Sequence, residues 1–237
     1  TIPTEFCKAL PNLNTLTLSN LPSLKEIPDD FLLDCTPGLV NLDLSYLTAV
    51  TTICNDFLKG CNKLVTLTMD GFKSVTTEVG DYFLQGCTSL TSLSMTNWTK
   101  IKSIGINFCD GCTNLRTVDL SDCSLLETIG NNFLSDCPNL QQLTMNNLGK
   151  LITISTYFCA EKTNLQRVYI KNWSSIQTIP RFFLYHCTSL TTLEDFKGMD
   201  NLKTIEMYFL GRCESLSGSF TLLNNLNALT TIGNCFL

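Results

Sequence analysis

Leucine and other apolar residues return to the same positions about every 25 residues along the whole chain. One copy runs from Leu115 through Val118 and Leu120 to Leu126 and Ile129, with polar residues between them. The first apolar column holds Leu13, Leu39, Leu64, Leu90, Leu115, Leu140, Leu165, Leu190 and Leu216. Because the same chemistry returns to the same place, the pattern predicts a repeat architecture across residues 1–237.

Each repeat predicts two short strands joined by turns. The alternation around Val118 and Leu120 indicates a strand on the inner side of a coil. A Thr-rich stretch ending at Ile129 suggests a second short strand on the outer side, and Pro or Gly often follows that Ile to turn the chain. The segment from Phe133 to Cys137 then predicts one 3₁₀ turn or short helix on the way back.

A single unit of this size cannot bury its apolar face, so neighbouring units must stack into a continuous core. The sequence therefore predicts a right-handed, β-rich solenoid of about nine repeats, with a parallel inner sheet and short outer strands. We expect a single domain over residues 1–237 that is truncated within a repeat at both ends. Residues 2–6 match residues 27–31, and Phe236 lacks its following turn.

Several features of each repeat together carry a family resemblance. They are LxxLxL, two further apolar columns, an Ile-Gly or Ile-Pro pair, Phe-Leu, and a Cys before the next unit. In this combination the chain resembles the BspA-like class of leucine-rich repeats over essentially its whole length. The resemblance implies a leucine-rich-repeat solenoid and a place in a cell-surface protein, with adhesion, host-protein binding or scaffolding as its role. An added apolar position, held by Trp98 and Trp173 in two repeats, departs from the usual shorter form.

The composition is that of a folded protein, since 44% of the residues are hydrophobic and 16% are charged. Sixteen basic and twenty-one acidic residues give a net charge of -5, and the basic residues are scattered. This distribution argues against a nucleic-acid partner or an anionic-membrane patch. No apolar run approaches the roughly 20 residues of a membrane-spanning helix, and no signal peptide is visible. We therefore expect no transmembrane segment in this stretch of chain.

The thirteen cysteines mostly occupy repeat positions. One column holds Cys35, Cys61, Cys87, Cys112, Cys137, Cys187 and Cys213, with Lys162 as its exception and Leu10 in the first unit. Replacement by Leu indicates a small apolar filler, because free Cys is among the most buried residue types. We predict mostly reduced, buried thiols, with several disulfides as the alternative. Neither redox state of the cysteines decides in which cellular compartment the protein lies.

Residue pairs that could carry chemistry also fall on repeat positions. Cys109 and Cys112 form a CxxC, but a structural zinc needs four ligands and no second CxxC or His pair accompanies them. His186 is the only histidine and adjoins Cys187, which belongs to the buried column. No phosphate-binding glycine motif is present. We expect no catalytic residue, cofactor or metal site, and hence a protein that is not an enzyme.

The polar residues of the inner strands are mostly small and hydroxylic, and strand propensity explains the Thr rows better than ice binding does. One strand differs, because Tyr169 lies between Arg167 and Lys171. An aromatic residue between two cations is typical of a binding hot spot, whereas the alternative is ordinary variation on a solvated strand. Neighbouring strands should add Gln142, Asn146 and Glu194 to this candidate partner-binding site.

Two N-glycosylation sequons begin at Asn97 and Asn172, each followed by a Trp that we expect to cover the core. The sequence favours a non-enzymatic protein-binding or adhesion module in a surface or secreted protein, with a protein or glycan partner at the inner strands. The alternative is an intracellular scaffold or assembly subunit of a larger complex. Glycan at either Asn would indicate the first, and unmodified Asn with reduced cysteines the second. The oligomeric state stays open.

Overall fold

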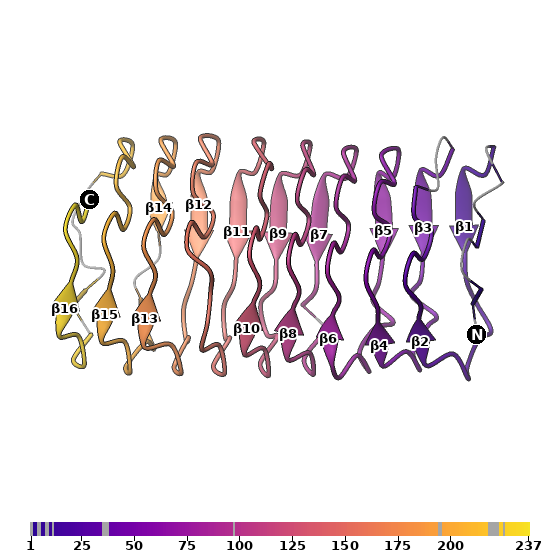
Figure 1. Ribbon diagram of the computed structural model, residues 1–237, viewed down its shortest axis with the longest axis horizontal. Helices are drawn as coiled ribbons and strands as arrows, with labels where there is room; N and C mark the ends of the chain where they lie inside the picture. The colour runs from indigo at the N-terminus through magenta and orange to yellow at the C-terminus, as the bar shows by residue number, and fades with distance from the viewer. Residues whose placement is uncertain are drawn as a thin grey trace.

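The computed structural model describes residues 2–3, 6–7, 10, 12–34, 38–96, 98–193, 196–217, 223–224 and 226–237. These residues form a parallel-sheet β-solenoid of about eight turns, whose coils follow one another along one axis (Figure 1). The repeat period therefore predicted the fold class correctly. No helix in the described ranges is long and apolar enough to cross a membrane.

Each coil contributes one strand to an inner row, which runs along the upper half of Figure 1. This row consists of β1 (Thr15–Thr17), β3 (Asn41–Asp43), β5 (Thr66–Thr68), β7 (Ser92–Ser94), β9 (Thr117–Asp119), β11 (Gln142–Thr144), β12 (Arg167–Tyr169) and β14 (Thr192–Leu193). Pairing is parallel and in register, so that Leu42 lies beside Leu16 and Leu143 beside Val118. The row is built from two sheets, ordered β1-β3-β5 and β14-β12-β11-β9-β7.

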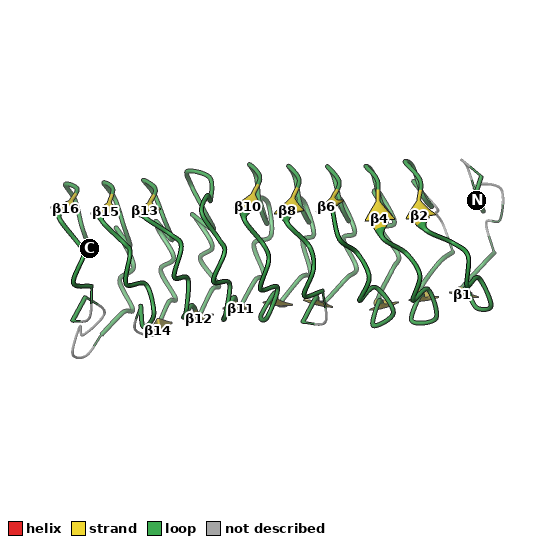
Figure 2. Cartoon of the chain, turned by 90° about the horizontal axis from the view of Figure 1, so that it is seen from below, coloured by secondary structure: helices red, strands yellow, loops and turns green. Residues whose placement is uncertain are grey.

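A second row of two-residue strands lies on the opposite side of the coils (Figure 2). It consists of β2 (Glu26–Ile27), β4 (Thr52–Ile53), β6 (Glu78–Val79), β8 (Ser103–Ile104), β10 (Thr128–Ile129), β13 (Thr178–Ile179), β15 (Thr204–Ile205) and β16 (Thr231–Ile232). These strands form two sheets, ordered β10-β8-β6-β4-β2 and β13-β15-β16. A single bridge from Thr128 to Thr153 extends the outer row beyond β10. The predicted short outer strands are thus present.

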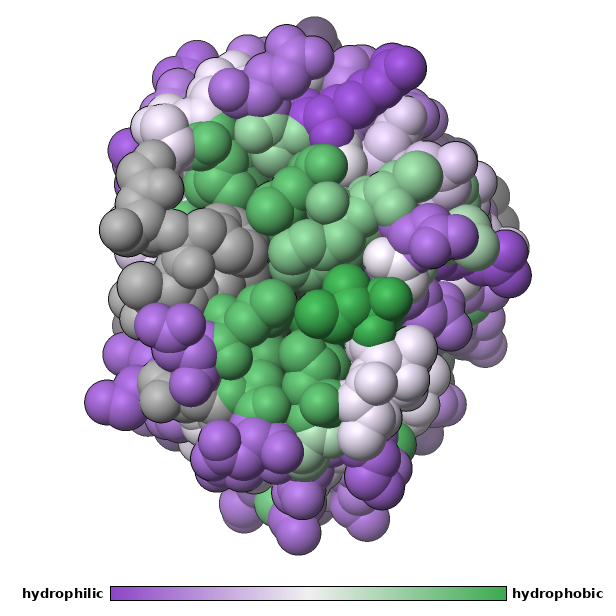
Figure 3. Space-filling view, turned by 90° about the vertical axis from the view of Figure 1, so that its left-hand side faces the viewer, coloured by the Kyte–Doolittle hydropathy of each residue, from purple (hydrophilic) through white to green (hydrophobic). Residues whose placement is uncertain are grey.

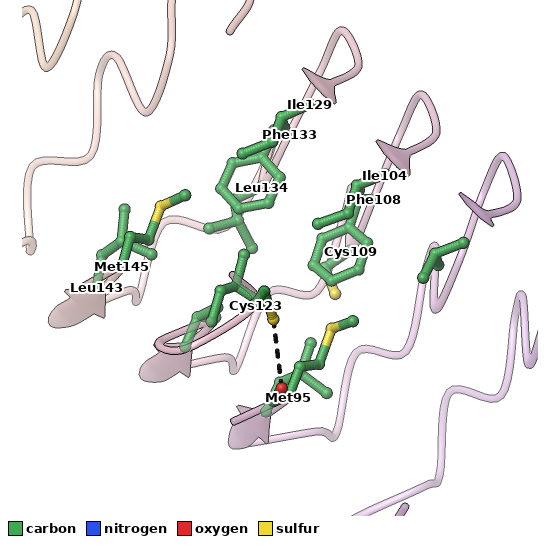
Figure 4. Packing of buried hydrophobic residues seen from close by; sticks show 14 of the residues in the cluster. Met95, Ile104, Phe108, Cys109, Cys123, Ile129, Phe133, Leu134, Leu143 and Met145 are labelled. Carbon is green, nitrogen blue, oxygen red and sulfur yellow. Dashed lines mark hydrogen bonds between the residues drawn. The ribbon is translucent and has the colours of Figure 1, made fainter. Parts of the chain in front are cut away.

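The apolar columns fill the space between the two rows. Because each column repeats in register, identical side chains stack coil upon coil, as Phe108 and Phe133 do in Figure 4. The rings of these two residues are 5.4 Å apart at their centroids and 15° from parallel. The buried ladder continues through Phe31, Phe57, Phe83, Phe108, Phe133, Phe158, Phe183 and Phe209. Stacked rings and buried aliphatic columns together make one continuous core.

The turn after the outer strand is not the 3₁₀ or helical turn that the sequence predicted, and the described residues contain no helix. Every second residue of this turn has a positive φ, as at Asp56 (57°), Leu58 (56°) and Gly60 (75°). A helix requires consecutive residues with negative φ, so alternation excludes it. The amide of Leu58 instead donates back to the Phe31 carbonyl at 3.0 Å, whereas that of Gly60 donates forward to Gln85 at 2.7 Å. The turn therefore bonds to the coils on both sides.

The end of the rod that carries β16 presents a broad apolar surface (Figure 3). Ile232 and Leu237, both in this last coil, are 48% and 55% exposed. In the interior of the rod the same Ile column is buried, for example at Ile205. In the interior of a solenoid each column is covered by the coil that follows it, and Ile232 lies in the last of the described coils.

Candidate functional site

The candidate site lies on the parallel strands β11 and β12, which are hydrogen-bonded neighbours of the inner row. Their register places Arg167 beside Gln142 and Tyr169 beside Thr144. Val168 is buried between the two outward residues of β12, as alternation along a strand requires. The structure therefore brings Arg167, Tyr169 and Gln142 together on the solvent-facing side of the inner row, as the sequence predicted.

Arg167 is held in place by its neighbour. Its side chain is exposed, and its Nε donates a hydrogen bond to Gln142 Oε1 at 3.0 Å. Gln142 in turn donates through Nε2 to Thr144 Oγ1 at 3.4 Å. A guanidinium whose Nε is already bonded keeps its terminal nitrogens available in a fixed direction. The pair can thus present donors to a carboxylate or carbonyl with less loss of side-chain freedom than a mobile Arg would.

Tyr169 and Lys171 complete the outward row of this coil. Both side chains are half-buried, and the fully buried Ile170 lies between them. The main-chain oxygen of Lys171 accepts a hydrogen bond from the amide of Asn147 at 2.9 Å, which extends the pairing beyond the assigned strand. An aromatic ring is therefore flanked by two cations on a backbone that the preceding coil fixes.

The two remaining predicted residues are not equivalent to these three. The amide of Asn146 donates to Ser121 Oγ at 3.3 Å, but Asn146 Oδ1 is buried and has no donor among the described residues. Asn146 as a whole is half-buried, so only its side-chain oxygen is withdrawn from the accessible surface. Glu194 lies outside the described residues.

A shallow hollow of about 290 Å³ adjoins Gln142 on the N-terminal side of β12. It lies over β7, β9 and β11, and its polar lining consists of Ser92, Ser94, Thr117, Asp119, Gln142 and Thr144. The side chains over the hollow are mostly short and hydroxylic, whereas the longer side chains of Gln142 and its partner Arg167 lie at its edge. Sequence reasoning did not assign the hollow. The change from Ser and Thr to Gln and Arg along one column is the signal that could have found it.

The sequon at Asn172 falls on a turn whose structure explains its Asn residue. Asn172 is exposed with a φ of 58°, and its Nδ2 donates to Asn147 Oδ1 at 2.6 Å. Asn147 donates in the same way to Asp122 Oδ1 at 2.8 Å, so the column forms a ladder. Asn and Asp tolerate positive φ better than other residues with side chains, which accounts for their recurrence. Asn97 lies outside the described residues, and glycosylation of either residue stays a prediction.

Both Trp residues that follow these Asn positions are buried, as predicted. Trp98 is 1% exposed and Trp173 is fully buried. The indole nitrogen of Trp173 donates to the Met145 carbonyl at 2.6 Å, and its ring lies edge-on to Phe158. The added apolar column of each repeat therefore covers the core, and the Trp side chains are not part of a surface site.

The cysteine column is engaged in main-chain hydrogen bonding. Each Sγ of Cys61, Cys87, Cys112, Cys137, Cys187 and Cys213 donates to a carbonyl oxygen of the preceding coil, at 3.1–3.3 Å. All six side chains are buried. Their burial agrees with the prediction of buried thiols, and the reduced state stays a prediction. The column does more than fill space, because it supplies donors to carbonyls inside the core.

The two residue pairs considered for chemistry lie in this core or at its edge. Cys109 and Cys112 are both fully buried, and burial raises the pKa of Cys109 well above its usual range. Cys187 directs its thiol to the Cys159 carbonyl at 3.3 Å. His186 is half-buried in the adjacent turn with a φ of 57°. The Cys187 thiol is thus committed to a main-chain acceptor and not to the imidazole.

The repeats match a known family. The family described as the BspA type leucine-rich repeat region matches residues 1–105 and 77–217, in six copies. The chain belongs to this family, whose leucine-rich repeats are typically non-enzymatic protein-interaction modules. No curated protein matches the chain significantly.

Solved structures of other leucine-rich repeat proteins also resemble the chain. A leucine-rich repeat protein of Bacteroides ovatus is 15% identical with a TM-score of 0.45, over 93% of this chain and 66% of its own length. One from Eubacterium ventriosum is 14% identical with a TM-score of 0.44, over 95% and 76%. A leucine rich cell surface protein of Faecalibacterium prausnitzii is 14% identical with a TM-score of 0.29, over 92% of each chain. The family assignment rests on the repeat match and the apolar columns.

Proposed function

We propose that the chain is a protein-binding module in a surface or secreted protein, and that the strands β11 and β12 contact its partner. The observation that carries this proposal is the hydrogen bond from Arg167 to Gln142, which fixes a cation beside Tyr169 on the exposed face of the inner row. Arg and Tyr are among the residues most enriched in binding hot spots. A protein partner with acidic or carbonyl-rich surface fits this cluster best.

The hollow over β7, β9 and β11 supports the same assignment. It lies directly beside Gln142, so a partner that contacts Arg167 can insert a side chain into it. The lining is polar and small, which suits a wet contact with hydrogen-bonding groups. The surface or secreted location is supported by the family and by the leucine rich cell surface protein of Faecalibacterium prausnitzii that the chain resembles.

A photo-crosslinking experiment tests the proposal. A benzophenone amino acid replaces Tyr169 in one variant and Thr66 of β5, which is exposed on the same row, in a matched control. After irradiation of the intact source cells, the Tyr169 probe is expected to crosslink to a distinct protein and the Thr66 probe is not. Equal labelling from both positions would contradict the site. Crosslinking only in the cytosol would favour the intracellular scaffold over the surface module.

A further inference from the structure

A second concave site lies on the flank of the rod formed by the turns that follow the outer strands. It is a depression of about 750 Å³ in volume that spans three successive coils. Its lining includes Asn132, Ser135, Asp136, Tyr157, Glu161 and Lys162. None of these residues belongs to an inner strand, so the depression is separate from the site on β11 and β12. Its volume is in the range of sites that hold small molecules.

The depression exists because side-chain size changes along two columns of the turn. One column holds Gln85 and Asp110 in two successive coils. In the next two coils its side chains are smaller, Ser135 and Ala160, and in the coil after those it holds the large Tyr185. In the column just before the buried Phe ladder, Asn132 is followed by Tyr157 in the next coil. Two small residues therefore form a gap, and an aromatic side chain forms the wall at its C-terminal edge.

Tyr157 is the first ring of an aromatic ladder on this flank. Its ring stacks on Phe182 at 4.4 Å and 4° from parallel, and Phe182 stacks on Tyr208 at 4.8 Å and 6°. Tyr185 lies edge-on to both Phe182 and Tyr208. Phe182 is thus enclosed by rings, whereas Tyr157 is 57% exposed and, among the described residues, stacks on another ring with one face only. The other face is turned towards the coil of Asn132, which lines the same depression.

Aromatic residues at this position are unusual for the backbone they occupy. Tyr157, Phe182 and Tyr208 have φ values of 59°, 60° and 61°. Bulky residues rarely adopt this conformation, and the equivalent residues of the preceding coils are Asn107 and Asn132. Three successive aromatic residues therefore occupy a position at which stacking helps to offset the cost of positive φ.

Lys162 adds a buried cation to the lining. It replaces the Cys of its column, is 8% exposed, and its Nζ donates to the Ala160 carbonyl at 3.2 Å. Within the described part of the chain, no carboxylate forms an ion pair with it. An ammonium can donate three hydrogen bonds, so this Lys can also offer a donor to a ligand oxygen. The opposite charges come from Asp136 and Glu161, which are exposed at the rim.

We propose that this depression, the flank site, binds a neutral saccharide. The uncovered face of Tyr157 carries the negative side of the ring quadrupole and attracts the C–H groups of a pyranose face. Asn132, Asp136 and Glu161 supply acceptors for sugar hydroxyls, and Ser135 and Lys162 supply donors. Lys162 disfavours a cation, and the two carboxylates disfavour an anion. A ligand with many hydroxyl groups and no charge satisfies all of these groups.

The test measures saturation-transfer NMR and titrations with three neutral probes: maltotriose, cellotriose and triacetylchitotriose. At least one is expected to bind the wild-type chain, and Tyr157→Ala is expected to weaken its affinity about tenfold or more. Tyr157→Phe retains the ring and should stay close to wild type. Tyr82→Ala removes a ring from the same column in a coil outside the flank site and is the matched control.

A second variant keeps the result clear if Tyr157→Ala fails to fold. Lys162→Cys restores the residue that other coils have in this column, so it should fold, and it should also weaken the affinity. The proposal is overturned if none of the three sugars binds, or if both variants bind as the wild type does. Binding of a lysine tripeptide in place of the sugars would overturn it as well. Because the flank site and the β11–β12 site share no residue, either can fail without the other.

Discussion

The thiol of Cys61 donates a hydrogen bond to the carbonyl oxygen of Leu32, 3.1 Å away in the preceding coil. Leu32 has a φ of 55°, and the same relationship joins Cys87 to Leu58, whose φ is 56°. The alternating turn directs these carbonyls into the core, where the thiol adds a donor, as at Leu58, whose carbonyl also accepts from the amide of Cys61 at 3.1 Å. A Cys provides a donor and remains small and apolar enough for the column. The repeated Cys therefore follows from the conformation of the turn.

Removing one such thiol should destabilise the rod measurably. Cys87→Ala leaves a small cavity and removes one of the two hydrogen bonds that the Leu58 carbonyl accepts, since the amide of Cys61 still donates to it at 3.1 Å. We expect the free energy of unfolding to fall by about 1–2 kcal/mol. Cys54→Ala, at a half-buried position after an outer strand, is the control and should change it less. Urea denaturation gives both values. Equal stability of Cys87→Ala and the wild type would show that the thiol hydrogen bond does not stabilise the fold.

The buried thiols also predict a loss of stability in alkali. Burial raises the pKa of Cys123 and Cys159 from 9.0 to about 12. Because the folded pKa exceeds the unfolded one, the fold favours the protonated thiol. This contribution is complete below the unfolded pKa and is lost as the pH rises through the folded pKa. Urea midpoints should therefore fall between about pH 9 and about pH 12.

Other groups titrate in the same range, so a variant must isolate the thiols. In Cys159→Ala the decline of the urea midpoint with pH should be shallower than in the wild type, although the variant is less stable at neutral pH. Cys235, which is exposed, offers a matched control in Cys235→Ala. A decline that is identical in all three proteins would show that the buried thiols do not contribute.

The Phe ladder should respond to position along the rod. Phe108→Ala removes a fully buried ring stacked between Phe83 and Phe133, and we expect a loss of about 3–5 kcal/mol in unfolding free energy. Phe236 is only partly buried and stacks on Phe209, so Phe236→Ala should cost clearly less. Thermal and urea unfolding of the two variants test this difference. Similar losses would contradict a core built by stacking of successive coils.

Substitutions at two glycines distinguish the cost of a positive φ from the cost of steric overlap between coils. Gly86 has a φ of 73°, and a Cβ placed there would meet nothing closer than 3.8 Å, so Gly86→Ala should cost about 1–2 kcal/mol through conformation alone. At Gly80 a Cβ would lie 2.6 Å from the carbonyl carbon of Cys54 in the coil below. We expect Gly80→Ala to destabilise the chain more, as measured by the midpoint of thermal unfolding. The reverse order would mean that the coils are less closely packed than described.

The sequence was sufficient for the parts of the structure that depend on column chemistry. Burial of Leu115, Ile129 and Trp173, and the stacking of Phe108 on Phe133, follow directly from the period. The sequence also predicted that Arg167 and Gln142 are neighbours, because coils in register place equivalent residues side by side. These features need only the repeat length and the inward or outward direction of each position.

Other features depend on backbone conformation or on differences between coils. Nothing in the residue type of Leu58 indicates a positive φ, so the turn was predicted as 3₁₀ or helical. The flank site arises where Ser135 and Ala160 adjoin Tyr157, a change in size that is lost when a column is described by its average residue. The sequence placed Asn146 at the candidate binding surface; the residue is half-buried, and the burial of its side-chain oxygen is a detail that the repeat period does not give.

The most direct test of the proposed function compares the affinity of the crosslinked partner for two variants. One replaces the cluster with the small residues of neighbouring strands, as Arg167→Ser, Tyr169→Thr and Lys171→Thr. The other, Lys63→Thr with Lys73→Ser, removes the same positive charge from exposed positions off the inner strands. By calorimetry the first should weaken binding about tenfold or more, and the second should leave it nearly unchanged. Unchanged affinity in the first variant, with its fold intact, would contradict the assignment of β11 and β12 as the binding surface.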